Sequence, residues 1–195
     1  MDQRQNRLDL RKRLFDLIKE RSFRRGNFTL ASGKQSAYYF DSKPTMLHPE
    51  GASLLAELIV DELRDVWADC VGGLEMGAVP LIAPVAIRSL EAGRPLLGFF
   101  VRKAPKDHGT RQRIEGLDLA GKTAVILEDV TTTGGSAMQA VEEVRAAGGT
   151  VALVLSILDR GEGAAELYAA AGVPFKSLFR DRKSTRLNSS HLFIS

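Results

Sequence analysis

Apolar residues recur along the first quarter of this chain with the periods of helices and then of strands. A helical repeat comes first and predicts an amphipathic helix that ends before the turn Arg24-Arg25-Gly26. Its apolar members are Leu10, Leu14, Leu17 and Ile18. Residues 28–41 then alternate around Ser32-Gly33-Lys34, which predicts two short strands. Pro49 begins a second helix, and its core face is predicted to carry Leu54, Leu55, Leu58, Ile59 and Leu63.

From residue 69 onward, predicted strands and helices alternate. Short apolar runs predict the strands, and longer periodic segments predict the helices. The expected order is strand 69–74, helix 78–91, strand 95–101, strand 123–128, helix 136–147, strand 150–158, helix 162–171 and strand 174–179. This alternation predicts an α/β fold with a mainly parallel sheet and helices on both faces.

Length and composition narrow the class of protein. The chain has 195 residues, 44% of them hydrophobic and 26% charged, which is enough for one compact domain with a large core. No apolar run approaches the length needed to span a membrane, and the first residues are polar and charged, unlike a signal peptide. Cys70 is the single cysteine, so we expect a buried thiol beside a strand and no internal disulfide or zinc site. These features predict a cytoplasmic protein.

The last 15 residues differ from the rest of the chain. Residues 181–191 are polar, show no clear period, and resemble the in-frame translation of a short-read sequencing adapter. We therefore expect one domain over residues 1–180 and a non-native tail over 181–195, the alternative being a natural disordered basic tail. Without the tail, three basic residues and one acid are lost, and the formal net charge falls from +3 to +1. The basic balance of the whole chain therefore says little about nucleic acid.

One segment, VILEDVTTTGGS at 125–136, combines the features of a sugar-phosphate site. Glu128 and Asp129 follow a buried strand and are expected to emerge together at its carboxyl end, where open α/β sheets bind ligands. Hydroxyl side chains and Gly134-Gly135 come next, and they open a helix whose backbone N–H groups are suited to an anion. The segment has no lysine, which argues against a nucleoside-triphosphatase loop. The plainer alternative is a strand that leaves its sheet and an ordinary capped helix.

This segment resembles the phosphoribosyl-diphosphate (PRPP) motif of type I phosphoribosyltransferases. The resemblance implies that Glu128 and Asp129 hold the ribose hydroxyls of PRPP. It also implies that the 5′-phosphate is bound by Thr131, Thr132, Thr133, Gly134, Gly135 and Ser136.

The long polar segment 102–116 contains five basic residues and His108, so it must be solvated or close over a ligand. A plain solvated loop is the alternative. It resembles the mobile catalytic loop of orotate phosphoribosyltransferases, with the pattern Arg-Lys-x-x-Lys-Asp-His-Gly. The resemblance implies that the diphosphate is contacted by Arg102, Lys103, Lys106 and His108. It further implies a homodimer in which Lys106 reaches the neighbouring subunit's site, and catalytic roles for Lys103, Lys106, His108 and Asp129.

Three more segments match the same family. Residues 28–41 resemble the hood over orotate, so residues 1–45 are expected to form an N-terminal helix and hood on an α/β core of residues 46–180. The hood implies orotate contacts from Lys34, Tyr38 and Tyr39, although Ala31 stands where some of these enzymes have lysine. Arg160 matches an arginine that grips the orotate carboxylate, a role that suits its planar fork. Residues 72–81 match the diphosphate loop, but Glu75 and Met76 stand at its centre, so only backbone contacts are expected there.

Taken together, the resemblance implies an enzyme that converts orotate and PRPP to orotidine 5′-monophosphate and diphosphate in pyrimidine (UMP) biosynthesis. Mg²⁺ is the implied cofactor, held mainly through PRPP and water with no direct protein ligand. Two alternatives stay open. One is a type I enzyme that uses a purine base. The other is a PRPP-binding regulator that contacts nucleic acid through the basic first helix. Asp9 and Asp16 interrupt that basic face, so we expect no nucleic-acid partner.

Overall fold

The computed structural model describes residues 3–29, 35–104, 113–181 and 192–193. The first part consists of α1 (Gln3–Arg21), β1 (Phe23–Thr29), β2 (Gln35–Phe40), α2 (Lys43–Met46) and α3 (Pro49–Glu62). The middle consists of β3 (Cys70–Gly72), α4 (Val79–Glu91), β4 (Leu97–Gly98), β5 (Phe100–Val101), β6 (Ile114–Glu115) and β7 (Thr123–Thr131). The last part consists of α5 (Gly135–Ala146), β8 (Thr150–Asp159), α6 (Ala164–Ala170), β9 (Phe175–Asp181) and β10 (Leu192–Phe193).

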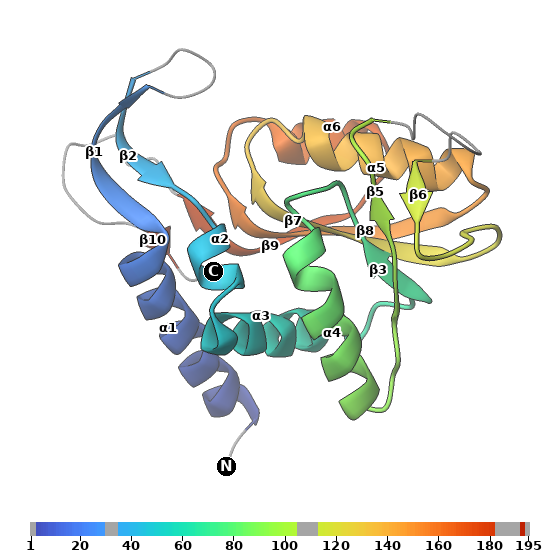
Figure 1. Cartoon of the computed structure of the whole chain (residues 1–195), viewed down its shortest axis with the longest axis horizontal. Helices are drawn as coiled ribbons and strands as arrows, with labels where there is room; N and C mark the ends of the chain where they lie inside the picture. The colour runs from blue at the N-terminus through green and yellow to red at the C-terminus, as the bar shows by residue number, and fades with distance from the viewer. Residues whose placement is uncertain (1–2, 30–34, 105–112, 182–191, 194–195) are drawn as a thin grey trace.

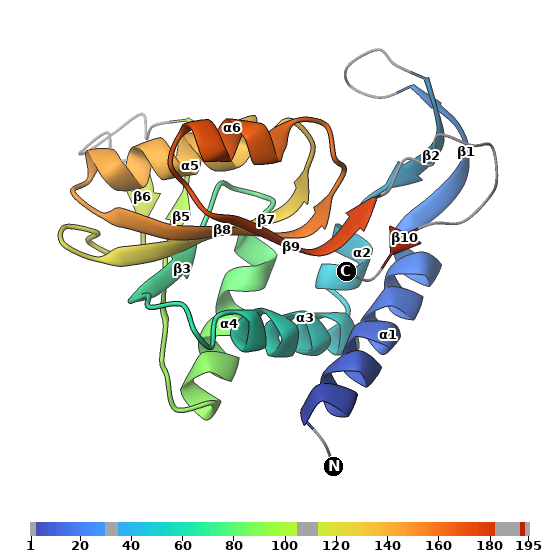
Figure 2. The ribbon, with the colours of Figure 1, turned by 180° about the vertical axis from the view of Figure 1, so that it is seen from behind.

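The central sheet has six strands in the described part of the chain, in the order β10-β9-β8-β7-β3-β4. All neighbouring pairs from β9 to β4 are parallel, and only β10 runs antiparallel, beside β9. Helices α5 and α6 cover one face, whereas α1, α3 and α4 lie on the other (Figure 1). The view from behind shows the β1–β2 hairpin extending from the sheet at the end where α1 and α2 meet (Figure 2). The predicted α/β fold is confirmed.

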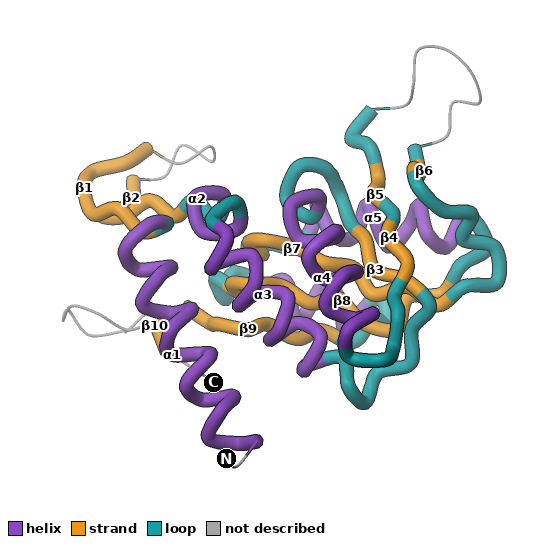
Figure 3. Tube along the Cα trace, turned by 60° about the horizontal axis from the view of Figure 1, so that its bottom comes forward, coloured by secondary structure: helices purple, strands orange, loops and turns teal. Residues whose placement is uncertain are grey.

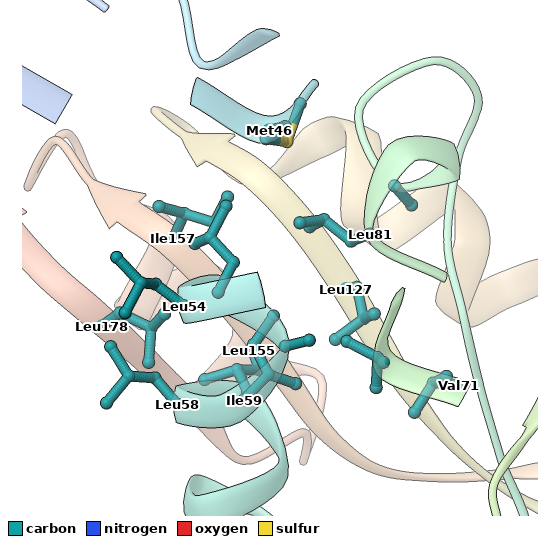
Figure 4. Packing of buried hydrophobic residues seen from close by; sticks show 14 of the residues in the cluster. Met46, Leu54, Leu58, Ile59, Val71, Leu81, Leu127, Leu155, Ile157 and Leu178 are labelled. Carbon is teal, nitrogen blue, oxygen red and sulfur yellow. The ribbon is translucent and has the colours of Figure 1, made fainter. Parts of the chain in front are cut away.

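Two hydrophobic layers sandwich the sheet because successive strand residues point to opposite faces. Along β7, Val125 and Leu127 belong to the core under α3 and α4, whereas Ala124 and Ile126 belong to the core under α5. Figure 4 shows the first layer, with side chains from α3, α4 and β8 gathered around Leu127. The five predicted core residues of α3 are all buried, as is Cys70. Both faces of β7 are therefore apolar until the strand reaches Glu128.

The structure corrects several predicted boundaries. Residues 24–26 form part of β1 and not a turn, because β1 pairs with β2 from Phe23 onward and absorbs an irregularity in register between Arg25 and Phe28. The predicted strand 95–101 is divided into β4 and β5, and β5 pairs with β6 in a separate two-stranded sheet. Strand β6 lies inside the segment predicted as loop, and β7 continues three residues beyond Glu128.

Strands β9 and β10 both include residues of the predicted non-native tail. Strand β9 ends at Asp181, and the Asp181 carboxylate accepts a hydrogen bond from the Tyr38 hydroxyl. Backbone pairing also joins β10 to β9. Whether the tail is native stays a prediction, which a truncation tests.

We expect deletion of 181–195 to leave folding and activity unchanged. A second truncation that keeps Asp181 isolates the effect of its carboxylate on Tyr38. Thermal unfolding and turnover of both truncations check this expectation. A large loss in either truncation would show that the tail is part of the native domain.

Candidate active site

The two adjacent carboxylates of the PRPP-like segment lie near the carboxyl end of β7. Glu128 is only 6% exposed and sits opposite Ser156 of β8. Asp129 is partly buried, and its two oxygens have different partners: the Ser42 hydroxyl donates to Oδ2, and the backbone N–H of Val130 donates to Oδ1 at 2.9 Å. Asp129 is therefore oriented by its own strand and by the residue that precedes α2.

The glycine segment between β3 and α4 lies directly against both carboxylates. A Cβ atom at Gly77 would be 2.6 Å from Asp129 Oδ1 and 2.7 Å from Glu128 Oε1. Only glycine fits this position without displacing those oxygens. The sequence indicated that residues 72–81 offer backbone contacts, but it gave no sign that Gly77 packs on the acidic pair. The only hint in the sequence of this contact was that a glycine follows shortly after β3.

Burial controls the ionisation of Glu128. Desolvation is the main cause that raises the pKa of Glu128, from 4.5 to about 8, and the nearby charge of Asp129 raises it further, whereas Lys103 lowers it. Glu128 Oε2 is buried and lacks a hydrogen-bond partner among the described residues. The site thus holds one oriented carboxylate and one that retains its proton near neutral pH, with an oxygen available to a ligand.

The raised pKa predicts a pH-dependent stability. The unfolded chain releases the Glu128 proton near pH 4.5, while the folded protein retains it until about pH 8, so stability should fall as pH rises across this window. Glu128→Gln removes the titration, and the variant should show a flatter profile between pH 5 and 8. Urea unfolding of both proteins at several pH values measures the difference. Parallel profiles would show that Glu128 titrates normally.

The loop after β7 has the geometry of an anion cradle. Gly134 is the N-cap of α5 and has a φ of +88°, which favours glycine, and its carbonyl accepts a hydrogen bond from the buried Tyr168 hydroxyl at 3.2 Å. Thr131 is buried, and the exposed members of the loop are Thr132, Thr133, Gly135 and Ser136. The N-terminus of α5 and these exposed groups face solvent together, as a phosphate site requires.

Arg160 and Tyr38 are in direct contact, although they are far apart in sequence. Arg160 Nη2 donates to the Tyr38 hydroxyl at 2.9 Å, and its guanidinium lies 5.0 Å from the centre of the Tyr38 ring. The Phe23 ring of β1 stacks on the Tyr38 ring, with a centroid distance of 5.0 Å. Tyr39 instead is exposed and contacts Phe28 at 5.6 Å. The structure therefore brings Tyr38, and not Tyr39, to Arg160.

Arg160 is held in place from its backbone as well. Its N–H donates to the carbonyl of Thr131 at 2.9 Å. This hydrogen bond joins Arg160 to the start of the loop that was predicted to bind phosphate. Asp159 Oδ1 accepts from the N–H of Gly161 at 2.8 Å, and Arg180 lies 3.3 Å from Asp159 Oδ2. Burial, followed by the hydrogen bond to Asp181, raises the pKa of Tyr38 to about 12, so its hydroxyl remains a donor at neutral pH.

No family model matches the chain. Comparison with individual known proteins nevertheless identifies its family. The chain is 56% identical over 177 residues to an orotate phosphoribosyltransferase of Bradyrhizobium sp. strain BTAi1, and the alignment covers 89% of this chain and 96% of that relative. The chain belongs to the orotate phosphoribosyltransferase family.

Solved orotate phosphoribosyltransferases share the fold described above. The enzyme of Mycobacterium tuberculosis H37Rv in complex with Fe(III) dicitrate superposes with a TM-score of 0.78 at 36% identity, covering 86% of this chain and 94% of that one. The same enzyme in complex with PRPP gives a TM-score of 0.74 at 34% identity, with the same coverage. The predicted fold and family are thus confirmed.

Some predicted site residues of this orotate phosphoribosyltransferase lie outside the described residues, namely Lys34, Lys106 and His108. Arg102 and Lys103 are described, and both lie at the end of β5, with Arg102 Nη1 3.8 Å from Glu115. No helix in the described ranges is both long and apolar enough to cross a membrane. The roles of the individual residues remain predictions, and the chemistry they support is developed below.

Proposed function

We propose that this chain transfers the 5-phosphoribosyl group from PRPP to orotate, giving orotidine 5′-monophosphate and diphosphate. One observation carries the proposal: the Thr131 carbonyl links buried Arg160, an anion-binding fork, to the loop that follows Glu128 and Asp129. The proposed sugar-phosphate site and the proposed carboxylate-binding site therefore lie next to each other. The PRPP complex of the Mycobacterium tuberculosis relative supports the donor half of this assignment.

The acidic pair and the anion cradle suit the two ends of the donor. We propose that Glu128 and Asp129 bind the ribose hydroxyls, while the N-terminus of α5 and the exposed hydroxyls of residues 132–136 bind the 5′-phosphate. The bond between the anomeric carbon and diphosphate breaks as a bond to an orotate ring nitrogen forms. Lys103 and Lys106 would stabilise the leaving charge, with Arg102 and His108 beside them. No covalent bond to the protein is needed.

Mg²⁺ is the cofactor we propose. Among the described residues, no three His, Cys, Asp or Glu side chains form a metal-binding group, and we propose that PRPP and water supply the ligands of the ion. When bound, the ion supplies positive charge to the diphosphate oxygens.

A homodimer is the proposed active form, with the 102–116 segment acting in the partner's site. Large exposed hydrophobic residues on α4 and beside it support a second copy as the partner, since such residues are frequent at interfaces. They are Met76, Ile87, Leu90 and Leu97. We propose that the enzyme is cytoplasmic, a location with which the buried thiol of Cys70 is compatible.

Incubation with orotate, PRPP and Mg²⁺ tests the proposal through the loss of orotate absorbance. We expect orotate to be consumed, with no product from hypoxanthine or adenine. Consumption of a purine base would favour the purine enzyme, whose donor site would be the same. Salt-sensitive nucleic-acid binding without product would instead favour the regulator and overturn the assignment.

A further inference from the structure

The peptide groups on both sides of Lys103 are held by side chains from other parts of the chain. The Lys103 N–H donates to Glu75 Oε1 at 2.9 Å, and the Lys103 carbonyl accepts from Arg113 Nη2 at 2.6 Å. The side chain of Lys103 is exposed. The backbone is therefore fixed in direction while the ammonium group stays free to meet a ligand.

Arg113 contacts more than one carbonyl of this segment. Its Nε donates to the Arg102 carbonyl at 3.0 Å, and Nη1 donates to Glu143 Oε1 of α5 at 2.7 Å. The backbone is paired as well, since the N–H of Arg102 donates to the Arg113 carbonyl at 2.8 Å. The planar guanidinium thus uses three nitrogens in three directions, an arrangement that lysine cannot reproduce. Figure 3 shows β5 and β6, which lead into and out of this segment, side by side.

Glu75 connects the backbone around Lys103 to the glycine segment between β3 and α4, which lies against Glu128 and Asp129. Its backbone N–H donates to the Val101 carbonyl, and the Val101 N–H donates to the Gly73 carbonyl, both at 2.8 Å. Gly77, two residues after Glu75, is the residue that lies against Glu128 and Asp129. Packing at Gly77, the short chain from Gly77 to Glu75 and the hydrogen bonds of Glu75 therefore connect the acidic pair to the backbone of Lys103.

We propose that Glu75 and Arg113, the latter braced by Glu143, are positioning residues that fix the backbone of Lys103 and thereby place its ammonium beside the diphosphate and the acidic pair. The inference rests on the proposed function, in which Lys103 stabilises the leaving diphosphate. The charge of Lys103 already acts on the acidic pair, because it lowers the pKa of Glu128. Glu75 stands at the centre of the segment that resembles the diphosphate loop, and its carboxylate accepts a hydrogen bond from the backbone N–H of Lys103.

Steady-state kinetics distinguish positioning from simple support of the β5–β6 hairpin. Glu75→Ala removes one hydrogen bond to Lys103 and should lower kcat about tenfold, while KM for PRPP changes by less than about twofold. Glu75→Gln keeps an acceptor oxygen and should retain at least about half of the wild-type kcat. Arg113→Ala removes three bonds and should lower kcat by about 30-fold or more. Glu143→Ala should have little further effect in the Arg113→Ala background, because both act through one contact.

Glu142→Ala is the matched control, since Glu142 is an exposed neighbour of Glu143 on α5. Its kcat should equal that of the wild type. Wild-type kcat in Glu75→Ala, an effect confined to KM, or equal losses in Glu75→Ala and Glu75→Gln would each overturn the proposal. So would additive losses for Arg113→Ala and Glu143→Ala.

Amide hydrogen exchange at Lys103 separates this inference from the proposed function. In the ligand-free protein, the Lys103 amide should be protected, and Glu75→Ala should raise its exchange rate about tenfold whereas Glu142→Ala should not. If the wild type makes no product but the exchange result holds, the proposed function fails and the contact to Lys103 stands. If exchange at Lys103 is the same in Glu75→Ala and wild type, Glu75 does not hold that backbone and the inference fails.

Discussion

Replacing Gly77 by alanine should lower kcat/KM for PRPP by at least about 100-fold, because a misplacement of about 1 Å at a catalytic group has an effect of that size. The added methyl group would lie 2.6 Å from Asp129 Oδ1 and 2.7 Å from Glu128 Oε1, much closer than carbon and oxygen can approach. To relieve this contact, one or both carboxylates would have to leave their observed positions. Asp129 is held by Ser42 and by the Val130 N–H, and Glu128 is buried.

Purified Gly77→Ala protein is assayed with PRPP at saturating orotate, and its folded fraction is measured by thermal unfolding. Gly172→Ala is the control for backbone strain, since Gly172 has a φ of +66° and no atom within 4 Å of the added Cβ. This control should lose about 1 kcal/mol of stability but keep the turnover of the folded protein. Wild-type kcat/KM in folded Gly77→Ala would show that the carboxylates do not need their observed positions.

Replacing Arg160 by alanine should lower kcat/KM for orotate about 100- to 1,000-fold, which corresponds to about 3–4 kcal/mol for the loss of a buried, charge-assisted contact. PRPP affinity should change little, because the N–H of residue 160 still donates to the Thr131 carbonyl. The Arg160 side chain is only 10% exposed and its guanidinium is already oriented by Tyr38, so orotate would meet a preformed fork. Alanine leaves no cation at this end of the site.

Calorimetry with PRPP and steady-state kinetics with orotate measure the two effects separately. Tyr38→Phe is the informative companion variant, because it keeps the stacked ring and removes only the hydroxyl, and its loss should be about tenfold. Arg145→Ala controls for removal of an exposed arginine, whose Nη2 donates to the Ala171 carbonyl at 3.2 Å. Equal losses of PRPP and orotate affinity in Arg160→Ala would place Arg160 in the donor site instead.

Strand β7 shows how much of the structure the local sequence pattern could predict. Four apolar residues followed by two acids, three threonines and two glycines predicted a buried strand and a helix that begins at the glycines, and both are present. Binding of a ligand and an anion there stays a prediction. The pattern did not predict that the strand continues through Glu128 to Thr131. Pairing with β8 extends it, because hydrogen bonds between strands depend on the neighbour and not on the side chains of β7 alone.

In the hairpin β1–β2, local composition predicted a turn where the structure has a strand. The residues Arg24-Arg25-Gly26 have the composition of a turn, yet pairing with Tyr38 and Tyr39 makes them part of a strand. Tertiary context overrides local preference here, since stacking of Phe23 on Tyr38 and the ladder bonds outweigh the cost of glycine in a strand.

Sequence by itself determined the layers, the two apolar faces of the sheet and the chemical character of the site, because periodicity and composition act over short stretches of chain. Only the tertiary structure decided that Gly77 lies against the acidic pair, that Arg160 binds Tyr38 across 122 positions, and that Glu75 and Arg113 hold the backbone of Lys103. Each of these contacts joins segments that are distant in sequence. Their geometry is set by how strands and helices pack, and no local pattern records it.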